Sequence, residues 1–379
     1  MTLTKHSKNP EIETLRALAI LLVIFRHLHY SLPFTVNDYP KILQGTWSGV
    51  DLFFVISGFV ITRSLSKNYR MLTEGVITTG QFLGAFYIRR IFRLLPVSLL
   101  ILFGYWLLCK YFSISGIFAD SNQVLTEAPY VIFYIYNLAV PFLDNAVLGW
   151  YWSLSIEEQF YFIYPFLLLF IKKNTSRLML FVAIIFAITF IVRPIYAANV
   201  TAERLWPLFT TPTYLRVDLL FAGCIIALLN TETLKLNKLQ LSILALISAL
   251  MVSLAGGALG FRPVLVYPII LLFSFILVYI AATENGVIPK NRVLNWIGGR
   301  SYSIYLLNIP MIHFTDECFF RITGATVKES PLWQGGISLA CSTLLMFLLA
   351  EVLFRYVEQP FTEKGIAISK RILSRNISA

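Results

Sequence analysis

The chain has 379 residues, of which 57% are hydrophobic and 13% charged, about half the charged fraction of an average soluble domain. This composition excludes an ordinary soluble protein and predicts an integral membrane protein. The net charge of +11 does not indicate nucleic-acid binding, because the basic residues are scattered in short loops instead of forming one stripe. No long polar block separates the apolar segments, so we expect a single membrane domain over residues 1–379.

Ten apolar segments are long enough to cross roughly 30 Å of hydrocarbon as helices, which predicts an all-α fold. They are residues 12–31, 48–66, 92–112, 152–171, 177–195, 212–230, 239–258, 264–283, 299–316 and 335–357. The stretch 129–142 is shorter and contains Pro129, Asn137 and Pro141, so we expect it to be re-entrant or interfacial. Residues 358–379 form a cytoplasmic tail.

The loop lysines and arginines are divided unequally between the two sides of the membrane. With ten spans, one side holds Lys5, Lys8, Lys67, Arg70, Arg89, Arg90, Lys172, Lys173, Arg177, Lys235, Lys238, Lys290, Arg292, Lys364, Lys370, Arg371 and Arg375. The other side holds only Lys41, Arg204, Arg262, Arg321 and Lys328. Because cytoplasmic loops are enriched in Lys and Arg, the first side is expected to be cytoplasmic and to carry both termini.

The first apolar segment lacks a small-residue cleavage site and contains Arg16 and Arg26, so we expect an uncleaved span. The cysteines form no CxxC pair and fall mostly in apolar segments, which predicts buried thiols instead of disulfides or a zinc site: Cys109, Cys224, Cys318 and Cys341. We expect no metal and no permanently bound cofactor.

Arg16 and His27 lie eleven residues apart in the first apolar segment. On a helix both side chains project from nearly the same face, separated by about 16 Å along the axis. Ionisable side chains within a membrane normally line a cavity or pathway, because contact with lipid is unfavourable. The pair therefore predicts a polar channel, with Arg16 near the cytoplasmic face and His27 near the outer face.

Three carboxylates enter the membrane from the side of His27. Asp51 opens the second span, and Glu157 and Glu158 lie in the first two turns of span 152–171. A carboxylate bonded to one ring nitrogen leaves the other nitrogen free to take a proton from a hydroxyl. We expect His27 to be a general base supported by Asp51 or, as second choice, by Glu158. Alternatively, Asp51 complements its helix dipole, or Glu158 forms a capping box with Ser155.

Arg89, Arg90 and Arg93 open the third span, and Arg90 and Arg93 have the i,i+3 spacing of one helix face. Together with Arg16 they predict a basic cytoplasmic mouth, which suits a donor with anionic phosphates and a long thin tail, such as coenzyme A. The alternative is that arginines here only anchor the topology by reaching lipid phosphates. We assign that role to Arg89.

Six motifs in order along the chain resemble those of the acyltransferase-3 family of membrane acyltransferases, whose bacterial members O-acylate cell-surface carbohydrates. They are Arg16-x10-His27, Gly49–Phe59, Arg90-x-x-Arg93, Trp152–Tyr161, Ser301–Leu306 and Glu358–Phe361. The resemblance implies that His27 is the catalytic base and that Arg16, Arg90 and Arg93 handle the acyl-CoA donor.

The same resemblance implies transfer of an acyl group, acetyl in the first place, from cytosolic acyl-CoA to a carbohydrate such as lipopolysaccharide O-antigen or exopolysaccharide. We expect the protein to lie in the bacterial inner membrane and to use a glycan or a lipid-linked glycan as the acceptor. Many relatives carry a C-terminal hydrolase-like domain, but this chain stops soon after its last span. We therefore expect a stand-alone membrane domain, acting as a homo-oligomer or with a separate extracytoplasmic partner.

One residue departs from the family pattern. Many relatives have a His after the Ser-Tyr-x-x-Tyr-Leu element, where this chain has Asn308, and His313 is expected to face elsewhere on the helix. A proton-coupled transporter remains an alternative function, because carriers also contain intramembrane charges. Carriers, however, commonly show inverted repeats, and no repeat is evident here.

Overall fold

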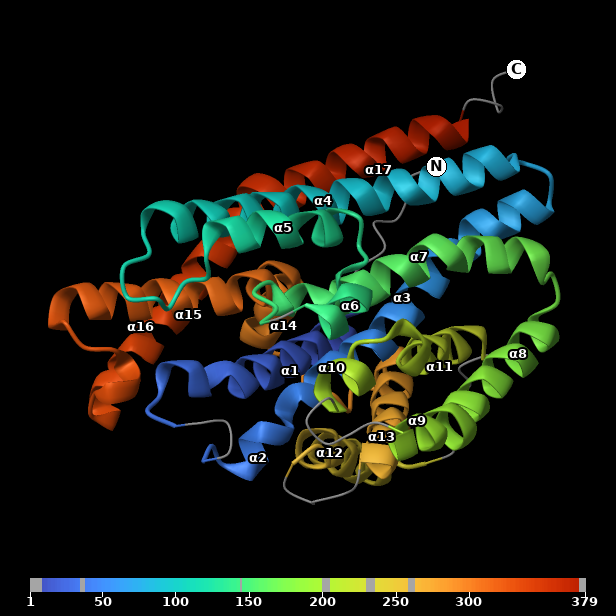
Figure 1. The fold of residues 1–379 in the computed structure, drawn as a ribbon. Helices are drawn as coiled ribbons and strands as arrows, with labels where there is room; N and C mark the ends of the chain where they lie inside the picture. The colour runs from blue at the N-terminus through green and yellow to red at the C-terminus, as the bar shows by residue number, and fades with distance from the viewer. Residues whose placement is uncertain are drawn as a thin grey trace.

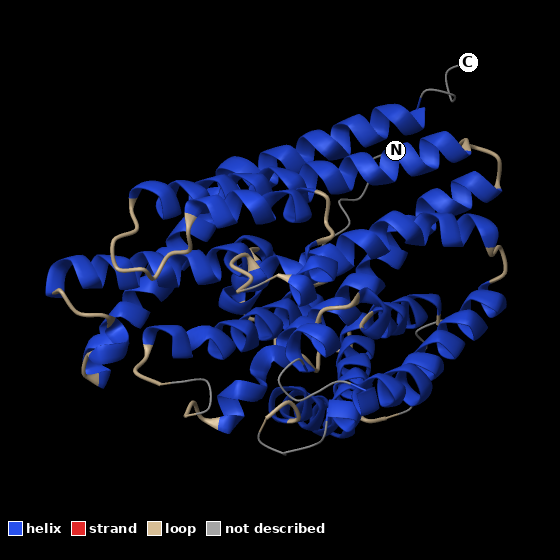
Figure 2. Cartoon of the chain, viewed as in Figure 1, coloured by secondary structure: helices blue, strands red, loops and turns tan. Residues whose placement is uncertain are grey.

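The computed structural model describes residues 9–34, 38–143, 145–199, 205–229, 236–257 and 263–374. Some basic residues of the charge comparison lie outside these ranges: Lys5, Lys8, Arg204, Lys235, Arg262 and Arg375. Within them the secondary structure is entirely helical, without a strand (Figure 2). The predicted all-α fold is thus confirmed for the described part of the chain.

Each predicted span overlaps a helix or helical unit of the described residues. In chain order these are α1 (Pro10–His27), α3 (Gly49–Thr73), α4 (Thr79–Tyr111), α7 (Trp152–Phe170), α8 (Asn174–Ala187) with a π-turn (Ile188–Val192) and α9 (Arg193–Asn199), α11 (Val217–Leu228), α12 (Lys238–Leu254), α13 (Pro263–Ala282), α15 (Ser301–Thr323) and α16 (Leu332–Leu353). The shorter helices are α2 (Lys41–Gln44), α5 (Ser121–Ile132), α6 (Tyr136–Ala139), α10 (Leu205–Thr210) and α14 (Arg292–Gly299).

In the described part of the chain, five helical units are long and apolar enough to cross a membrane: 41–73, 79–111, 174–199, 264–282 and 332–374. Large apolar side chains are exposed on several of these units. On α8 and the following π-turn, Met179 is 72% and Phe190 63% exposed. Large exposed apolar surfaces of this kind are unfavourable in water and favourable against lipid.

Three segments differ in detail from a simple series of spans. Residues 129–142 are divided between the end of α5, a turn with positive φ at Tyr134, α6 and a 3-10 turn. Helix α11 has only 12 residues, a length of about 18 Å, because the chain before it forms a separate 3-10 turn, Thr213–Leu215. The expected tail contains α17 (Gln359–Ser374), which runs along α4 (Figure 1).

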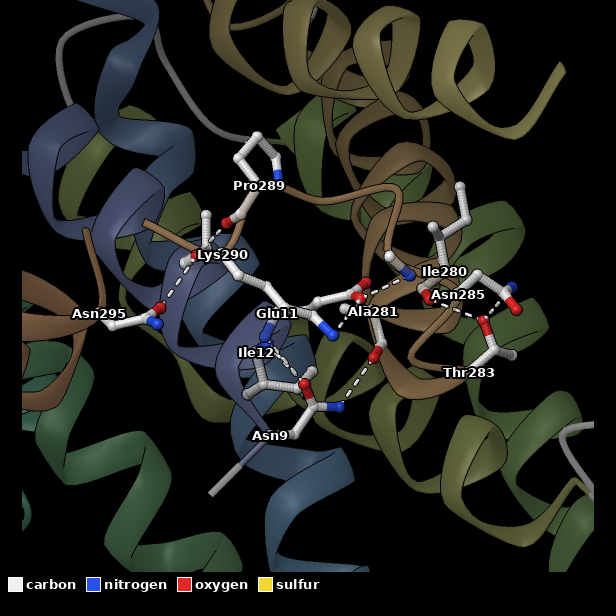
Figure 3. A network of polar contacts seen from close by, with 12 residues as sticks. Asn9, Glu11, Ile12, Ile280, Ala281, Thr283, Asn285, Pro289, Lys290 and Asn295 are labelled. Atoms are coloured by element: carbon white, nitrogen blue, oxygen red, sulfur yellow. Dashed lines mark hydrogen bonds and ion pairs between the residues drawn. The ribbon is translucent and has the colours of Figure 1, made fainter. Parts of the chain in front are cut away.

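The start of α1 is fixed by polar contacts to the end of α13 and to the segment that follows it (Figure 3). Asn9 caps the helix by accepting a hydrogen bond from the Glu11 amide (2.9 Å) and donates to the carbonyl of Ala281 (2.8 Å). The buried carboxylate of Glu11 accepts from the amide of Gly286 (2.8 Å) and pairs with Lys290. These contacts fix the rotation of α1, and so the direction in which Arg16 and His27 project.

Helices α3 and α11 cross closely because each has a glycine at the contact. A Cβ atom at Gly58 would overlap the carbonyl oxygen of Leu220, and a Cβ atom at Gly223 would overlap that of Val55. Small residues at helix crossings allow such close approach in membrane proteins. The crossing holds the first half of α3, which carries Asp51 and Ser57, in the middle of the molecule.

Candidate active site

Two cavities adjoin in the core. The first, here called the arginine cavity, has a volume of about 90 Å³ and is lined by residues of α1, α3, α4, α7 and α15, including Arg16, Arg90 and Arg93. The second, the histidine cavity, has a volume of about 940 Å³ and includes His27 in its lining. The arginines predicted to form one basic site thus share one cavity, and Arg89 is not among its described lining residues.

In the arginine cavity the cations face a single hydrogen-bonded carboxylate. Arg90 stacks on the ring of Tyr161, with its guanidinium carbon 4.9 Å from the ring centroid. Glu157 also lines the cavity and accepts hydrogen bonds from Ser57 (2.6 Å) and Tyr161 (3.4 Å). Arg16 pairs at 3.5 Å with Glu13. Among the described lining residues, three guanidinium groups accompany the one carboxylate of Glu157, and Glu13 outside the lining pairs only with Arg16. The lining itself therefore has an excess of cations, which favours an anionic ligand.

The histidine cavity is wider and largely aromatic. The rings in its lining belong to Tyr30, Trp47, Tyr105, Phe118, Trp150, Trp152, Tyr267 and Tyr305. Its ionisable groups include Arg26, His27 and His313. A large concave site with many rings and a few polar groups has the character of a ligand site.

Val50 and Tyr305 line both cavities. The Tyr305 hydroxyl donates a hydrogen bond to the carbonyl of Trp150 (2.8 Å) and lies 2.7 Å from Oγ of Ser153. The two cavities therefore meet at a wall formed by one side chain from α3 and one from α15.

His27 is the last residue of α1, and its contact is Asn308 of α15: Nδ1 lies 2.7 Å from Nδ2 of the amide. In this orientation the amide donates to Nδ1, so a neutral ring carries its proton on Nε2. In the opposite amide orientation Oδ1 accepts from Nδ1–H and leaves Nε2 free to act as a base. Oδ1 of Asn308 has no other hydrogen-bond partner in the described chain, so the opposite orientation breaks no existing hydrogen bond of this oxygen.

Asp51, the first choice as supporting acid, forms a buried ion pair with Arg216, while His27 contacts Asn308. The Arg216 guanidinium also stacks on Tyr267, 4.5 Å from the ring centroid. Because Tyr267 lines the histidine cavity, the ion pair supports a wall of this cavity.

Beside this pair lies a second one. Arg193 and Asp218, both buried, meet at 2.9 Å. The guanidinium carbon of Arg193 lies 4.9 Å from the centroid of the same Tyr267 ring.

Glu158 was the second choice as the acid that supports His27, and a capping box with Ser155 was its alternative role. The structure does not contain this capping box. Helix α7 begins at Trp152 without a side-chain cap among the described residues, and the Ser155 hydroxyl donates to the carbonyl of Tyr151, the residue before the helix (3.2 Å). A preceding 3-10 turn, Gly149–Tyr151, starts the helix earlier than the sequence pattern indicates. Oε1 of Glu158 is buried and has no hydrogen-bond partner among the described residues, whereas Glu157 lines the arginine cavity.

His313, expected to face elsewhere than Asn308, lines the histidine cavity. Its Nδ1 lies 3.0 Å from the hydroxyl of Tyr105 on α4. Three features of the site were not predicted from the sequence: the contact of His27 with Asn308, the position of His313 in the cavity lining and the ion pair of Asp51 with Arg216. The one available signal was the departure from the family pattern at Asn308.

Comparison with known proteins links this geometry to a family. The sequence profile of a family described as an acyltransferase domain matches residues 9–351. The peptidoglycan O-acetyltransferase OatA of Listeria monocytogenes is 29% identical over 96% of the chain, and the O-acetyltransferase OatA of Staphylococcus aureus strain NCTC 8325 is 27% identical over 94%. The chain spans 57% of the length of each of these relatives. No solved structure matches the chain.

Proposed function

The chain belongs to the acyltransferase-3 family, and from this premise we propose that it is a membrane O-acyltransferase. In this proposal it moves an acyl group, acetyl in the first place, from cytosolic acyl-CoA to a hydroxyl of a cell-surface carbohydrate. The observation that carries the proposal is the adjoining pair of cavities, one with three arginines and one with His27 and aromatic rings.

The arginine cavity suits the acyl end of the donor. At about 90 Å³ it is much smaller than the roughly 300–1,000 Å³ of a typical small-molecule site, so it can hold a narrow thioester tail but not a whole nucleotide. In this proposal the phosphates of acyl-CoA stay outside the cavity and pair with Arg16, Arg90 and Arg93 of its lining, whose guanidinium donors match phosphate oxygens. Acyl-CoA is a co-substrate in this scheme, and no cofactor is permanently bound.

The histidine cavity suits the acceptor. Aromatic faces pack against the apolar faces of sugar rings, while their polar edges bond hydroxyl groups. The names of the relatives include a peptidoglycan O-acetyltransferase, which supports a carbohydrate class of acceptor. Lipopolysaccharide O-antigen, exopolysaccharide and peptidoglycan are the candidates within this class.

The chemistry needs one base and one leaving group. The acceptor hydroxyl oxygen attacks the thioester carbonyl carbon while Nε2 of His27 takes the hydroxyl proton. The carbon–sulfur bond then breaks, coenzyme A leaves as the thiolate, and the proton passes from His27 to that thiolate. Asn308 is a positioning residue in this scheme, because its amide oxygen selects the tautomer with a free Nε2.

We further propose ten membrane crossings, with both termini on the cytoplasmic side of a bacterial inner membrane. The lysines and arginines of the loops support this orientation. It directs the Arg16 end of α1 toward cytosolic acyl-CoA and the His27 end toward the cell surface. The acceptor can be a lipid-linked glycan, delivered by a second copy or a separate extracytoplasmic partner.

The test compares the surface glycans of a strain with and without this gene by mass spectrometry. We expect ester-linked acetyl groups that disappear on deletion and return with the wild-type gene, but not with His27→Gln. Unchanged glycans after deletion would contradict the proposal. If, instead, deletion abolishes proton-coupled uptake or export and leaves glycans unmodified, the transporter alternative is correct.

A further inference from the structure

We propose that Val50 and Tyr305 determine the length of the acyl group that this chain transfers, and that they restrict it to short chains such as acetyl. This inference rests on the acyltransferase function proposed above. Its basis is that these two side chains line both cavities. A thioester held in the arginine cavity must present its acyl group at this wall to meet an acceptor in the histidine cavity.

Tyr305 is held by contacts at the tip of its ring. Its hydroxyl donates to the carbonyl of Trp150 (2.8 Å) and lies at hydrogen-bond distance (2.7 Å) from Oγ of Ser153. Both partners precede or begin α7, so the tip is tied to a different helix from the one that carries Tyr305. A ring that is buried and hydrogen-bonded in this way cannot swing aside without losing its contacts.

Val50 is equally constrained, because both of its neighbours in sequence are fixed. A Cβ atom at Gly49 would overlap the carbonyl oxygen of Ala19, which places α3 directly against α1. Asp51 forms the buried ion pair with Arg216. A β-branched side chain also has little rotamer freedom on a helix. The wall is therefore rigid on both sides.

The small volume on the donor side makes the wall selective. The arginine cavity, at about 90 Å³, must also hold the thioester, so each methylene added to the acyl group presses it against Val50 and Tyr305. Overpacking a close-packed site is unfavourable. A smaller side chain at either position should relieve the overpacking and admit longer acyl groups.

The experiment is a competition in which purified protein receives equal concentrations of acetyl-CoA and butyryl-CoA with one soluble oligosaccharide acceptor. Mass spectrometry of the product gives the acetyl-to-butyryl ratio. Wild type should favour acetyl strongly. Val50→Ala and Tyr305→Leu should each shift the ratio toward butyryl by about tenfold or more, the discrimination typical of a methylene in an apolar pocket.

Matched controls separate the wall from the rest of the cavities. Val55→Ala makes the same change on the same helix as Val50→Ala, at a side chain that is not among the described lining residues of either cavity, and Val266→Ala changes the lining of the histidine cavity alone. Both should keep the wild-type ratio. Tyr305→Phe keeps the ring and loses the tether, so its shift should be smaller than that of Tyr305→Leu.

Failure of this inference can be distinguished from failure of the proposed function. If wild type transfers acetyl and Val50→Ala gives the same acetyl-to-butyryl ratio, the two residues do not select the acyl group. A wild-type preference for butyryl would also contradict this selectivity. If Tyr305→Leu does not fold, Val50→Ala alone decides. Absence of transfer from either donor by wild type overturns the acyltransferase function itself, and the wall with it.

Discussion

The two cavities differ in size, in charge and in how their key residues are held. The arginine cavity is small and brings together three guanidinium groups with one hydrogen-bonded carboxylate. The histidine cavity is about ten times larger, and its two histidines contact neutral groups, Asn308 and Tyr105. Under the proposed function, this contrast predicts a division of labour: the charged groups bind the donor, while the imidazole and aromatic side chains bind the acceptor.

The largest effect should come from the histidine cavity. His27→Gln removes the proposed base and should lower kcat by about 10²–10⁴, because a positioned base contributes that much to the rate. His29→Gln is the matched control, since the same change occurs two residues away at a ring that contacts the carbonyl of Arg26. The measurement is the rate of acetyl transfer by folded protein. A near-wild-type rate for His27→Gln would contradict the assignment of His27 as the general base.

The arginine cavity should respond through binding. Arg90→Ala and Arg93→Ala should raise the apparent KM for acetyl-CoA about tenfold or more, with less change in kcat, because a lost charged hydrogen bond is worth roughly 1.5–3 kcal/mol. Arg89→Ala, on the same helix, should leave this KM near the wild-type value. Equal KM values for all three variants would reduce Arg90 and Arg93 to topology anchors.

A smaller effect should follow from the partner of His27. Asn308→Ala should lower kcat by up to about tenfold, the scale of one neutral hydrogen bond, and leave the KM for acetyl-CoA unchanged. Asn308→Asp should recover part of the loss, since a carboxylate oxygen also accepts from Nδ1–H. Steady-state kinetics of both variants test this, and an Asp variant as slow as the Ala variant would argue against a role in ring orientation.

Asp51 should matter least for the chemical step and most for stability. Asp51→Asn leaves Arg216 as a buried charge without its ion-pair partner, a change that typically destabilises by about 3–5 kcal/mol. We expect a lower Tm in detergent and a kcat, per folded molecule, close to wild type. A steep loss of kcat at unchanged Tm would instead restore Asp51 as the acid that supports His27.

The sequence predicted those features of the structure that depend on residues close together in the chain. Hydropathy located the helices, and helical spacing grouped Arg90 with Arg93. The grouping with Arg16 followed from the expected topology. Hydropathy and helical spacing can be read within one helix, and the topology can be read from the basic residues of successive loops.

Contacts between distant helices were not predictable in the same way. Asp51 and Arg216 are separated by 165 positions, and no local pattern pairs them. Asn308 reaches His27 across 281 positions. The capping box considered for Ser155 and Glu158 is absent for a local reason: a 3-10 turn precedes α7, so the helix begins before Ser155.

In the proposed function, one path through the protein joins a donor site on the cytoplasmic side of the membrane to His27 near the outer side. Sealed proteoliposomes test it most directly, with acetyl-CoA trapped inside and the oligosaccharide acceptor outside. We predict acetylated acceptor outside, with Arg90→Ala reducing its rate at low acetyl-CoA and His27→Gln abolishing it. Product formed only when donor and acceptor share one compartment would contradict the claim.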